Sequence, residues 1–258
     1  MRLLNLFFRV ALVGMLAGCN ALTECENIKP REAILLIDVT DKQLFEDIEA
    51  DLKANLPTFM AKTGLGNIAP CESFTLTLVP ISAKEGLQAT SETIAINRKG
   101  QSYQAEKQQA SPAPLVNLLK GQLTEFKALT ENDDLTSGSS IANVMIKALT
   151  HANLEAETTL IIFSDMIENN QYLNMYRHIP ATEELSEVVP QLIDPLVLEE
   201  FQARQREGLD ANIIIVCKDS PNKKVNARQR DVKSFWAGLL GEMKLHNIQF
   251  MDNLTNIN

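Results

Sequence analysis

Short apolar runs separated by stretches of helical periodicity are the feature that most limits how this chain can fold. In the stretches between the runs, apolar side chains recur every three or four residues, as they do on one face of a helix. Strands that alternate with helices indicate an α/β domain with a mostly parallel central sheet. The predicted strands are residues 33–38, 73–81, 92–98, 158–165, 211–217 and 247–254.

We expect a doubly wound, Rossmann-like sheet with helices on both faces and with residues 92–98 as one antiparallel edge strand. Pro57 lies inside the first helical stretch and predicts a kink there, because proline lacks a backbone donor. Residues 166–210 are long for one connection between strands, and we interpret them as a crossover that contains a helix. The predicted helices are residues 42–62, 114–130, 140–152, 195–208 and 227–245.

The N-terminal residues are typical of a secretory signal rather than of a folded domain. Arg2 precedes a mostly apolar stretch that is too short and too interrupted by polar residues to span a bilayer comfortably. The sequence Leu16-Ala17-Gly18-Cys19 resembles the lipobox of bacterial lipoproteins. That resemblance implies a signal peptide at residues 1–18 and lipid attachment to Cys19, with palmitate among the acyl chains.

Several acyl chains anchor a protein to a membrane more stably than one chain does. Asn20 follows the lipidated position, which implies sorting to the outer membrane, facing the periplasm, if the cell is Gram-negative. Residues 19–31 are then a lipid-anchored tether, and residues 32–255 form the folded domain. The expected location is therefore the cell membrane, through the lipid anchor.

The charge of the chain limits its partners. It carries 33 Asp and Glu against 24 Lys and Arg, a formal net charge of −9. An acidic protein is repelled by polyanions, so nucleic acid and anionic lipid are disfavoured as partners. The same charge is compatible with a divalent cation.

The cysteines predict one structural bridge. The periplasm permits disulfides. Cys25 precedes the first strand and Cys71 precedes the second, so both lie at the same sheet edge if these strands are parallel neighbours. We therefore expect a Cys25–Cys71 disulfide. Cys217 ends an apolar run and is expected to be a buried free thiol.

Two of the predicted strands end in an acid, Asp38 and Asp165. Ligands of open α/β sheets bind outside the carboxyl ends of the strands, so both side chains are expected at the binding edge. A hydroxyl-rich loop that contains Ser139 opens a helix between them in the sequence. Carboxylate and hydroxyl oxygens are hard ligands, which suit Mg²⁺, Ca²⁺ or Mn²⁺ rather than zinc. The alternative is that these acids cap helices without an ion.

At these positions the chain resembles the von Willebrand factor type A (vWA) domain family over residues 32–255. The stretch Asp38-Val39-Thr40-Asp41-Lys42 corresponds to the family's Asp-x-Ser/Thr-x-Ser motif. Ser139 corresponds to the threonine of the family's Gly-Thr loop, and Asp165 to the acid after its fourth strand. The resemblance implies a metal-ion-dependent adhesion site for Mg²⁺ or Mn²⁺ with Asp38, Thr40, Ser139 and Asp165 as metal residues.

The match departs from the family pattern at two positions. Lys42 replaces the second hydroxyl of the first motif, which removes a ligand and brings a cation near the site. Met166 replaces the small residue that commonly follows the acid.

Three functions remain open on this sequence. The first is an envelope binding module that presents the strand-end edge to a protein or cell-envelope partner. The second is a metal-free assembly scaffold of the same fold. The third is a metal-assisted hydrolase or phosphatase with Asp38 as nucleophile and Lys42 binding phosphate. Haloacid-dehalogenase-like enzymes carry a second Asp two residues after the first, where this chain has Thr40. We therefore expect a protein that is not an enzyme.

Overall fold

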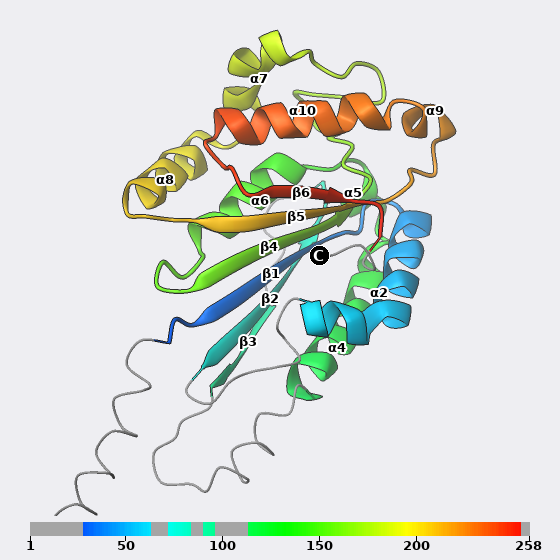
Figure 1. The fold of residues 1–258 in the computed structure, drawn as a ribbon. Helices are drawn as coiled ribbons and strands as arrows, with labels where there is room; N and C mark the ends of the chain where they lie inside the picture. Colours follow the sequence, from blue (N-terminus) through cyan, green and yellow to red (C-terminus); the bar gives the residue numbers. More distant parts are fainter. Residues whose placement is uncertain (1–27, 63–71, 84–89, 96–112, 254–258) are drawn as a thin grey trace, which may run out of the picture.

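The computed structural model describes residues 28–62, 72–83, 90–95 and 113–253. Its centre is a six-stranded sheet in the order β3-β2-β1-β4-β5-β6 (Figure 1). Strand β3 pairs antiparallel with β2 at one edge, and every other neighbouring pair is parallel. The strands are β1 (Arg31–Asp38), β2 (Ser73–Ile81), β3 (Thr90–Ala95), β4 (Glu157–Ser164), β5 (Ala211–Cys217) and β6 (Ile248–Met251).

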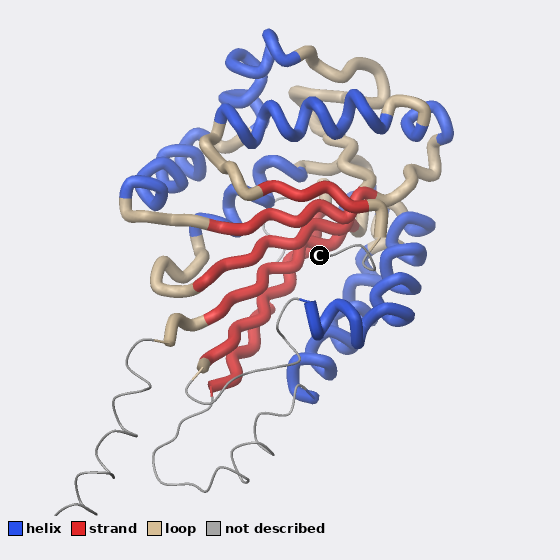
Figure 2. The backbone as a smooth tube through the Cα atoms, in the orientation of Figure 1, coloured by secondary structure: helices blue, strands red, loops and turns tan. Residues whose placement is uncertain are grey.

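Helices cover both faces of the sheet (Figures 1 and 2). One face packs against α2 (Lys42–Lys62) and α4 (Ala113–Leu129) in one hydrophobic cluster. The other face packs against a larger cluster with four helices, which are α6 (Ile141–Thr150), α7 (Leu185–Leu192), α8 (Pro195–Arg206) and α10 (Gln229–Glu242). The predicted α/β class, with a mostly parallel sheet and helices on both faces, is therefore confirmed.

Strand β1 is buried on both sides, which explains its continuous apolar sequence. Ile34 and Leu36 belong to the cluster under α6, whereas Leu35 and Ile37 belong to the cluster under α2. Successive side chains of a strand point to opposite faces. A strand between two helical layers therefore needs apolar residues at every position rather than at alternate ones.

The long connection between β4 and β5 contains the predicted helix and further short elements. Helix α8 begins at Pro195 and ends at Arg206, and Gly208 follows with a φ of 99°, a backbone conformation that favours glycine. The 3-10 turn η1 (Thr182–Glu184) and α7 precede α8. The polar stretch 131–140 includes the one-turn helix α5 (Asp133–Thr136), which Asn132 caps.

Helix α2 has the predicted bounds, whereas the predicted helix 227–245 differs in detail. Helix α2 runs from Lys42 to Lys62 and continues through Pro57. In Figure 1 its axis changes direction before its C-terminal part. The predicted helix 227–245 is shorter as α10 and is preceded by the separate turn α9 (Lys223–Asn226).

The strand order places a topological switch point between β1 and β4. From β1 the chain adds β2 and β3 on one side, then returns to add β4, β5 and β6 on the other. Connections on the two sides leave in opposite directions, which opens a crevice at the carboxyl ends of the two central strands. Asp38 ends β1 and Asp165 directly follows β4, so both lie at this crevice.

The carboxyl end of β4 is also tied to the last helix. The indole nitrogen of Trp236 in α10 donates to the carbonyl oxygen of Met166 at 2.7 Å. Both side chains are completely buried, and Met166 adopts a positive φ of 62°. This bond therefore fixes the backbone immediately after Asp165.

Some predictions fall outside the described part of the chain. The signal peptide at 1–18, the lipidated Cys19 and the Cys25–Cys71 disulfide all lie there. Cys217 is a buried free thiol, as predicted.

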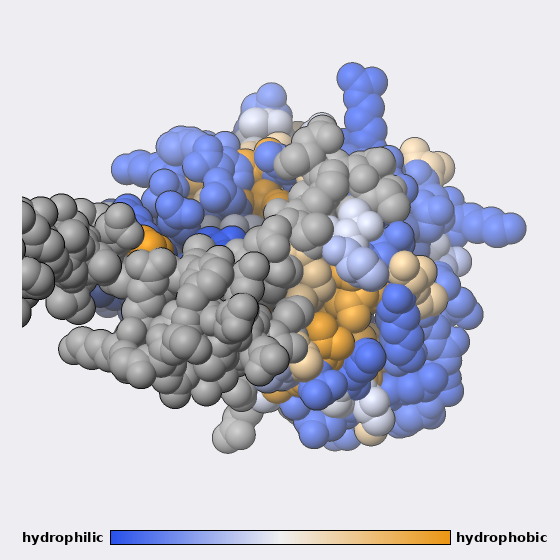
Figure 3. Space-filling view, turned by 60° about the horizontal axis from the view of Figure 1, so that its bottom comes forward, coloured by the Kyte–Doolittle hydropathy of each residue, from blue (hydrophilic) through white to orange (hydrophobic). Residues whose placement is uncertain are grey.

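In the described ranges no helix combines the length and the apolar character needed to cross a membrane. Most of the described surface on the face shown in Figure 3 is hydrophilic, and its largest hydrophobic area lies near the centre of the view.

Candidate functional site

Asp38 joins the two central strands at their carboxyl ends. One carboxylate oxygen, Oδ1, accepts from the backbone nitrogen of Thr40 at 3.0 Å and from its hydroxyl at 2.5 Å. The other, Oδ2, accepts from the hydroxyl of Ser164 in β4 at 2.6 Å. The side chain is 1% exposed, and burial raises the pKa of Asp38 above its usual range. Asp38 is thus a buried acid with a donor on each oxygen.

Asp165 lies beside this acid. Its Oδ1 accepts from the backbone nitrogen of Ile167 at 3.0 Å, and the residue is 4% exposed. Burial raises the pKa of Asp165 to about 7, and the negative charge of Asp38 adds to the shift. A buried carboxyl group whose pKa is raised by a neighbouring carboxylate favours binding of a proton or a cation.

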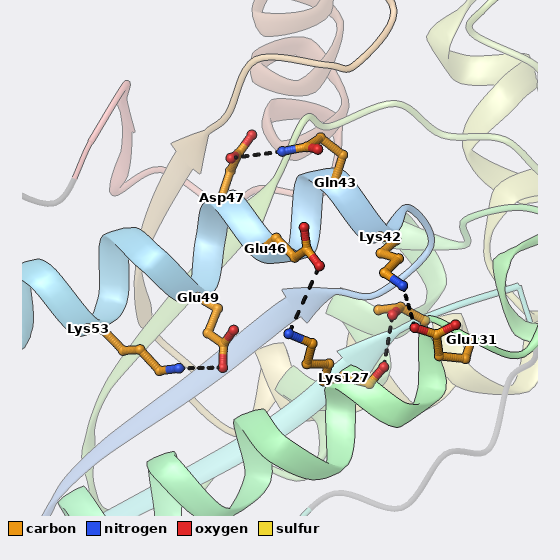
Figure 4. A network of polar contacts seen from close by, with 9 residues as sticks. Lys42, Gln43, Glu46, Asp47, Glu49, Lys53, Lys127 and Glu131 are labelled. Carbon is orange, nitrogen blue, oxygen red and sulfur yellow. Dashed lines mark hydrogen bonds and ion pairs between the residues drawn. The ribbon is translucent and has the colours of Figure 1, made fainter.

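Lys42 does not supply that positive charge. Its ammonium nitrogen pairs with Oε1 of Glu131 at 2.6 Å, and both side chains are more than half exposed. Figure 4 shows the pair bridging the start of α2 and the region after α4. Asp41, next in sequence, accepts from the backbone nitrogen of Leu44 at 2.9 Å and caps α2. Lys42 therefore begins a helix with its charge directed away from the two aspartates.

Ser139 is held by a backbone bridge rather than by the aspartates. Its nitrogen donates to the carbonyl oxygen of Asn169 at 2.8 Å, and the nitrogen of Asn169 donates back at 3.1 Å. Its hydroxyl donates to the carbonyl oxygen of Ile167 at 2.5 Å. The structure thus brings the loop of Ser139 to the strand-end edge, as predicted, but this hydrogen bond of the hydroxyl is not made to either aspartate.

Glu168 is a buried acid that the sequence reasoning did not single out. It is 0% exposed, and its two oxygens accept from the backbone nitrogen of Ala142 at 3.0 Å and from the amide of Asn170 at 2.8 Å. Burial raises the pKa of Glu168 to about 8. The only sign of Glu168 in the sequence was its position three residues after Asp165. The fold then places its carboxylate at the start of helix α6.

The aromatic stretch after β4 divides between core and surface. Met175 is completely buried, whereas Tyr172 and Tyr176 are 60% and 43% exposed. Burial and the negative charges of Asp165 and Asp38 raise the pKa of Tyr176. The partly exposed Tyr176 therefore lies within electrostatic reach of the carboxyl pair.

The residues present fit a divalent cation in part. Thr40 gives its hydroxyl proton to Asp38, which leaves the oxygen lone pairs of the hydroxyl for a cation. The carboxylate of Asp165 accepts from the Ile167 nitrogen through Oδ1 and also accepts from the side chain of Ser220, so part of its capacity is already used. In the part of the chain that the structure describes, no three Asp, Glu, His or Cys side chains are grouped so that they could hold a metal ion. A cation here would depend on hydroxyl ligands.

Comparisons with known proteins place few limits on the family. No protein-family model matches the sequence, and no curated protein matches it. The pilus adhesin SpaC from Lactobacillus rhamnosus GG matches in two forms, with TM-scores of 0.43 and 0.44 and 11% identity, over 90% of this chain and 29% of the adhesin. The human COPII-coat protein Sec24c matches with a TM-score of 0.37 and 14% identity, over 81% of this chain and 29% of that chain.

The chain therefore spans less than a third of the length of these proteins. Likeness at such low identity and TM-score assigns neither a family nor an activity.

Gly138 is required where its loop meets the segment after β4. A Cβ atom there would lie 2.3 Å from the carbonyl oxygen of Asn169, the acceptor of the Ser139 bridge. We expect Gly138→Ala to lower the free energy of unfolding by about 1–3 kcal/mol, because the backbone must move. Chemical denaturation followed by circular dichroism measures this.

Gly121→Ala is the matched control for Gly138→Ala. A Cβ at Gly121 would meet nothing within 4 Å, and the residue lies inside α4. We expect Gly121→Ala to raise stability by up to about 1 kcal/mol, because alanine favours helix. Equal effects of the two substitutions would contradict the close approach at Gly138.

The raised pKa of Asp165 makes the stability of the fold depend on pH. The folded pKa of about 7 exceeds the unfolded value of about 3.9, so the native state binds more protons between these values. This contribution is present below about pH 4 and is lost as pH rises through 7, by at most about 1.4 kcal/mol per pH unit. We expect Asp165→Asn to be more stable than the wild type at pH 8, with a shallower loss of stability between pH 4 and 7.

Denaturant unfolding from pH 4 to pH 8 measures this difference. Glu168 contributes with the same sign, so part of the pH dependence remains in the variant. Asp47→Asn, at an exposed acid of α2, is the control and should leave the slope unchanged. An unaltered slope in Asp165→Asn would show that Asp165 is ionised at neutral pH.

Proposed function

We propose that this chain is a vWA-like interaction module of the bacterial cell envelope, anchored through a lipid on Cys19. Its partner, a protein or another envelope component, binds at the carboxyl edge of the sheet over Asp38 and Asp165. The observation that carries the proposal is the pair of buried carboxyl groups at the switch point, where the charge of Asp38 raises the pKa of Asp165. Among the described residues, neither acid forms an ion pair with a basic side chain, so a positive group from outside is favoured there.

The surface around the pair also suits a partner. Tyr176 is exposed beside the carboxyl groups, and tyrosine is enriched at protein interfaces because it combines a large apolar ring with a polar end. The site is held by main-chain hydrogen bonds and by Trp236 beneath it. A rigid, acidic and partly aromatic edge can bind a partner without a large rearrangement.

A divalent cation is the second part of the proposal. Asp38, Thr40 and Asp165 would hold Mg²⁺ or Mn²⁺, with Ser139 contributing if its hydroxyl turns from the Ile167 carbonyl. When bound, such an ion supplies positive charge and a coordination position that an acidic group of the partner can occupy. The chain's own residues orient the site, because Asp38 fixes the Thr40 hydroxyl.

Two alternatives remain as proposals of lower weight. A metal-free assembly scaffold would use the same edge, with a proton shared by the carboxyl pair in place of the ion. A phosphatase would need Asp38 as a nucleophile, but this acid is buried with a hydrogen bond on each oxygen. It would also need Lys42 at the phosphate, whereas Lys42 pairs with Glu131. Hydrolysis of a generic phosphatase substrate that is lost in Asp38→Asn would favour the enzyme.

Cation binding is tested by thermal unfolding of the wild type and two variants with Mg²⁺ or Mn²⁺. We expect the ion to raise the midpoint of the wild type, by an amount that corresponds to about 2.7 kcal/mol at a hundredfold excess over Kd. The shift should be larger at pH 8 than at pH 6, because protons compete for Asp165. Asp165→Asn should abolish the shift, and Lys42→Ala should retain it. If the midpoint of the wild type does not shift at pH 8, the cation proposal is wrong and the metal-free scaffold is favoured.

The location of the partner is tested by photo-cross-linking of the full-length chain in its own envelope. A photoreactive side chain at Tyr176 reports on the carboxyl edge, and one at Glu155, exposed just before β4, reports on the amino edge. We expect a discrete cross-linked species from position 176 and none from position 155. The same species from both positions would contradict binding at the carboxyl edge.

A further inference from the structure

A cavity of about 760 Å³ lies beside the loop before α6. Three segments line it: the loop before α6, the segment after β4, and the connection between α7 and α8. Asp38, Thr40 and Asp165 are not among its lining residues. The volume is in the range of small-molecule sites, and nothing in the cation proposal uses this cavity.

The hydroxyl of Ser140 is the buried group that points to a ligand. Ser140 is 7% exposed and lines the cavity at the start of α6. Its side chain makes no cap hydrogen bond to the helix, and within the described residues it has no other hydrogen-bond partner. The Ser140 oxygen is not one of the fully enclosed atoms that lack a partner in the described residues, so it keeps access to the cavity and can bond a ligand there. In the first turn of α6, the backbone nitrogen of Ala142 already donates to the carboxylate of Glu168.

Further polar groups of the lining retain capacity for a ligand. Asp194 caps α8 through Oδ1, which leaves Oδ2 as an acceptor. Asn169 is bonded through its backbone to Ser139, which leaves its side-chain amide as both donor and acceptor. Tyr172 lines the cavity and is 60% exposed, so a face of its ring is open. The cavity thus offers a hydroxyl, an amide, a carboxylate and an aromatic ring.

The same lining disfavours other classes of ligand. It contains no Lys, Arg or His, so phosphate and other anions find no cationic partner. An apolar ligand would cover the polar side chains of Ser140, Asn169 and Asp194 without bonding them, which is unfavourable. The cavity lies at strand ends and not along an unpaired strand, so a peptide cannot add to the sheet there.

We propose that this cavity binds a neutral carbohydrate. Each sugar hydroxyl both donates and accepts, which matches the mixed set formed by Ser140, Asn169 and Asp194. The C–H face of a sugar ring stacks on an open aromatic side chain, which matches Tyr172. The chain would then recognise a neutral glycan of the cell envelope through this cavity, independently of any cation at Asp38 and Asp165.

Calorimetric titration of the full-length chain in a detergent without sugar groups tests this proposal. The probes are a neutral oligomer of N-acetylglucosamine, maltotriose, inorganic phosphate and triglycine. We expect binding of at least one of the two sugars, and none of phosphate or triglycine. Tyr172→Ala and Ser140→Ala should each weaken sugar binding by about tenfold. Thermal unfolding should show wild-type midpoints, because Ser140 makes no cap bond and Tyr172 is exposed.

Tyr176→Ala is the matched control, since this tyrosine is exposed but does not line the cavity. It should bind the sugar as the wild type does, and so should Asp165→Asn, which separates this proposal from the cation site. The proposal is overturned if neither sugar binds, if phosphate or triglycine binds instead, or if the Ser140 and Tyr172 variants bind the sugar as tightly as the wild type.

Discussion

Burial of strand β1 between two helical layers is the constraint on which the rest of the structure depends. Its odd and even positions contact different hydrophobic clusters, so β1 must lie inside the sheet with parallel neighbours on both sides. That position sends the chain outward first to one side and then to the other. The crevice between β1 and β4 follows from this order, and its polar residues come from the strand ends.

Hydrogen bonds at the strand ends allow acids to persist beside that core. An unpaired buried carboxylate would be very costly, and Asp38 avoids this through Thr40 and Ser164. Glu168 is satisfied in the same way by the start of α6 and by Asn170. Asp165 is the least balanced of the three, because it lies against the charge of Asp38. Asp165 is therefore the acid whose protonation we expect to follow pH, while the other two acids fix the geometry.

Two separate surfaces open at this end of the molecule. One is the acidic pair with Tyr176, and the other is the neutral polar cavity with Ser140 and Tyr172. The segment after β4 contributes to both, because it leaves the sheet at Asp165 and passes the loop before α6 at Asn169. Gly138 makes this approach feasible, since a larger residue would collide with the backbone. A module with both surfaces could bind an envelope glycan and a partner together.

The sequence by itself determined the α/β class, nearly all the strands and the placement of Asp38 and Asp165 at one edge. Hydrophobic periodicity reports which faces are buried, and the carboxyl ends of parallel strands share an edge whatever the loops do. Only the tertiary structure decided that Lys42 faces Glu131, that the Ser139 hydroxyl bonds Ile167, and that Ser140 borders a cavity. These outcomes depend on where helices and loops that are distant in sequence come to lie. A local pattern of residues does not say which of these distant groups a side chain will contact.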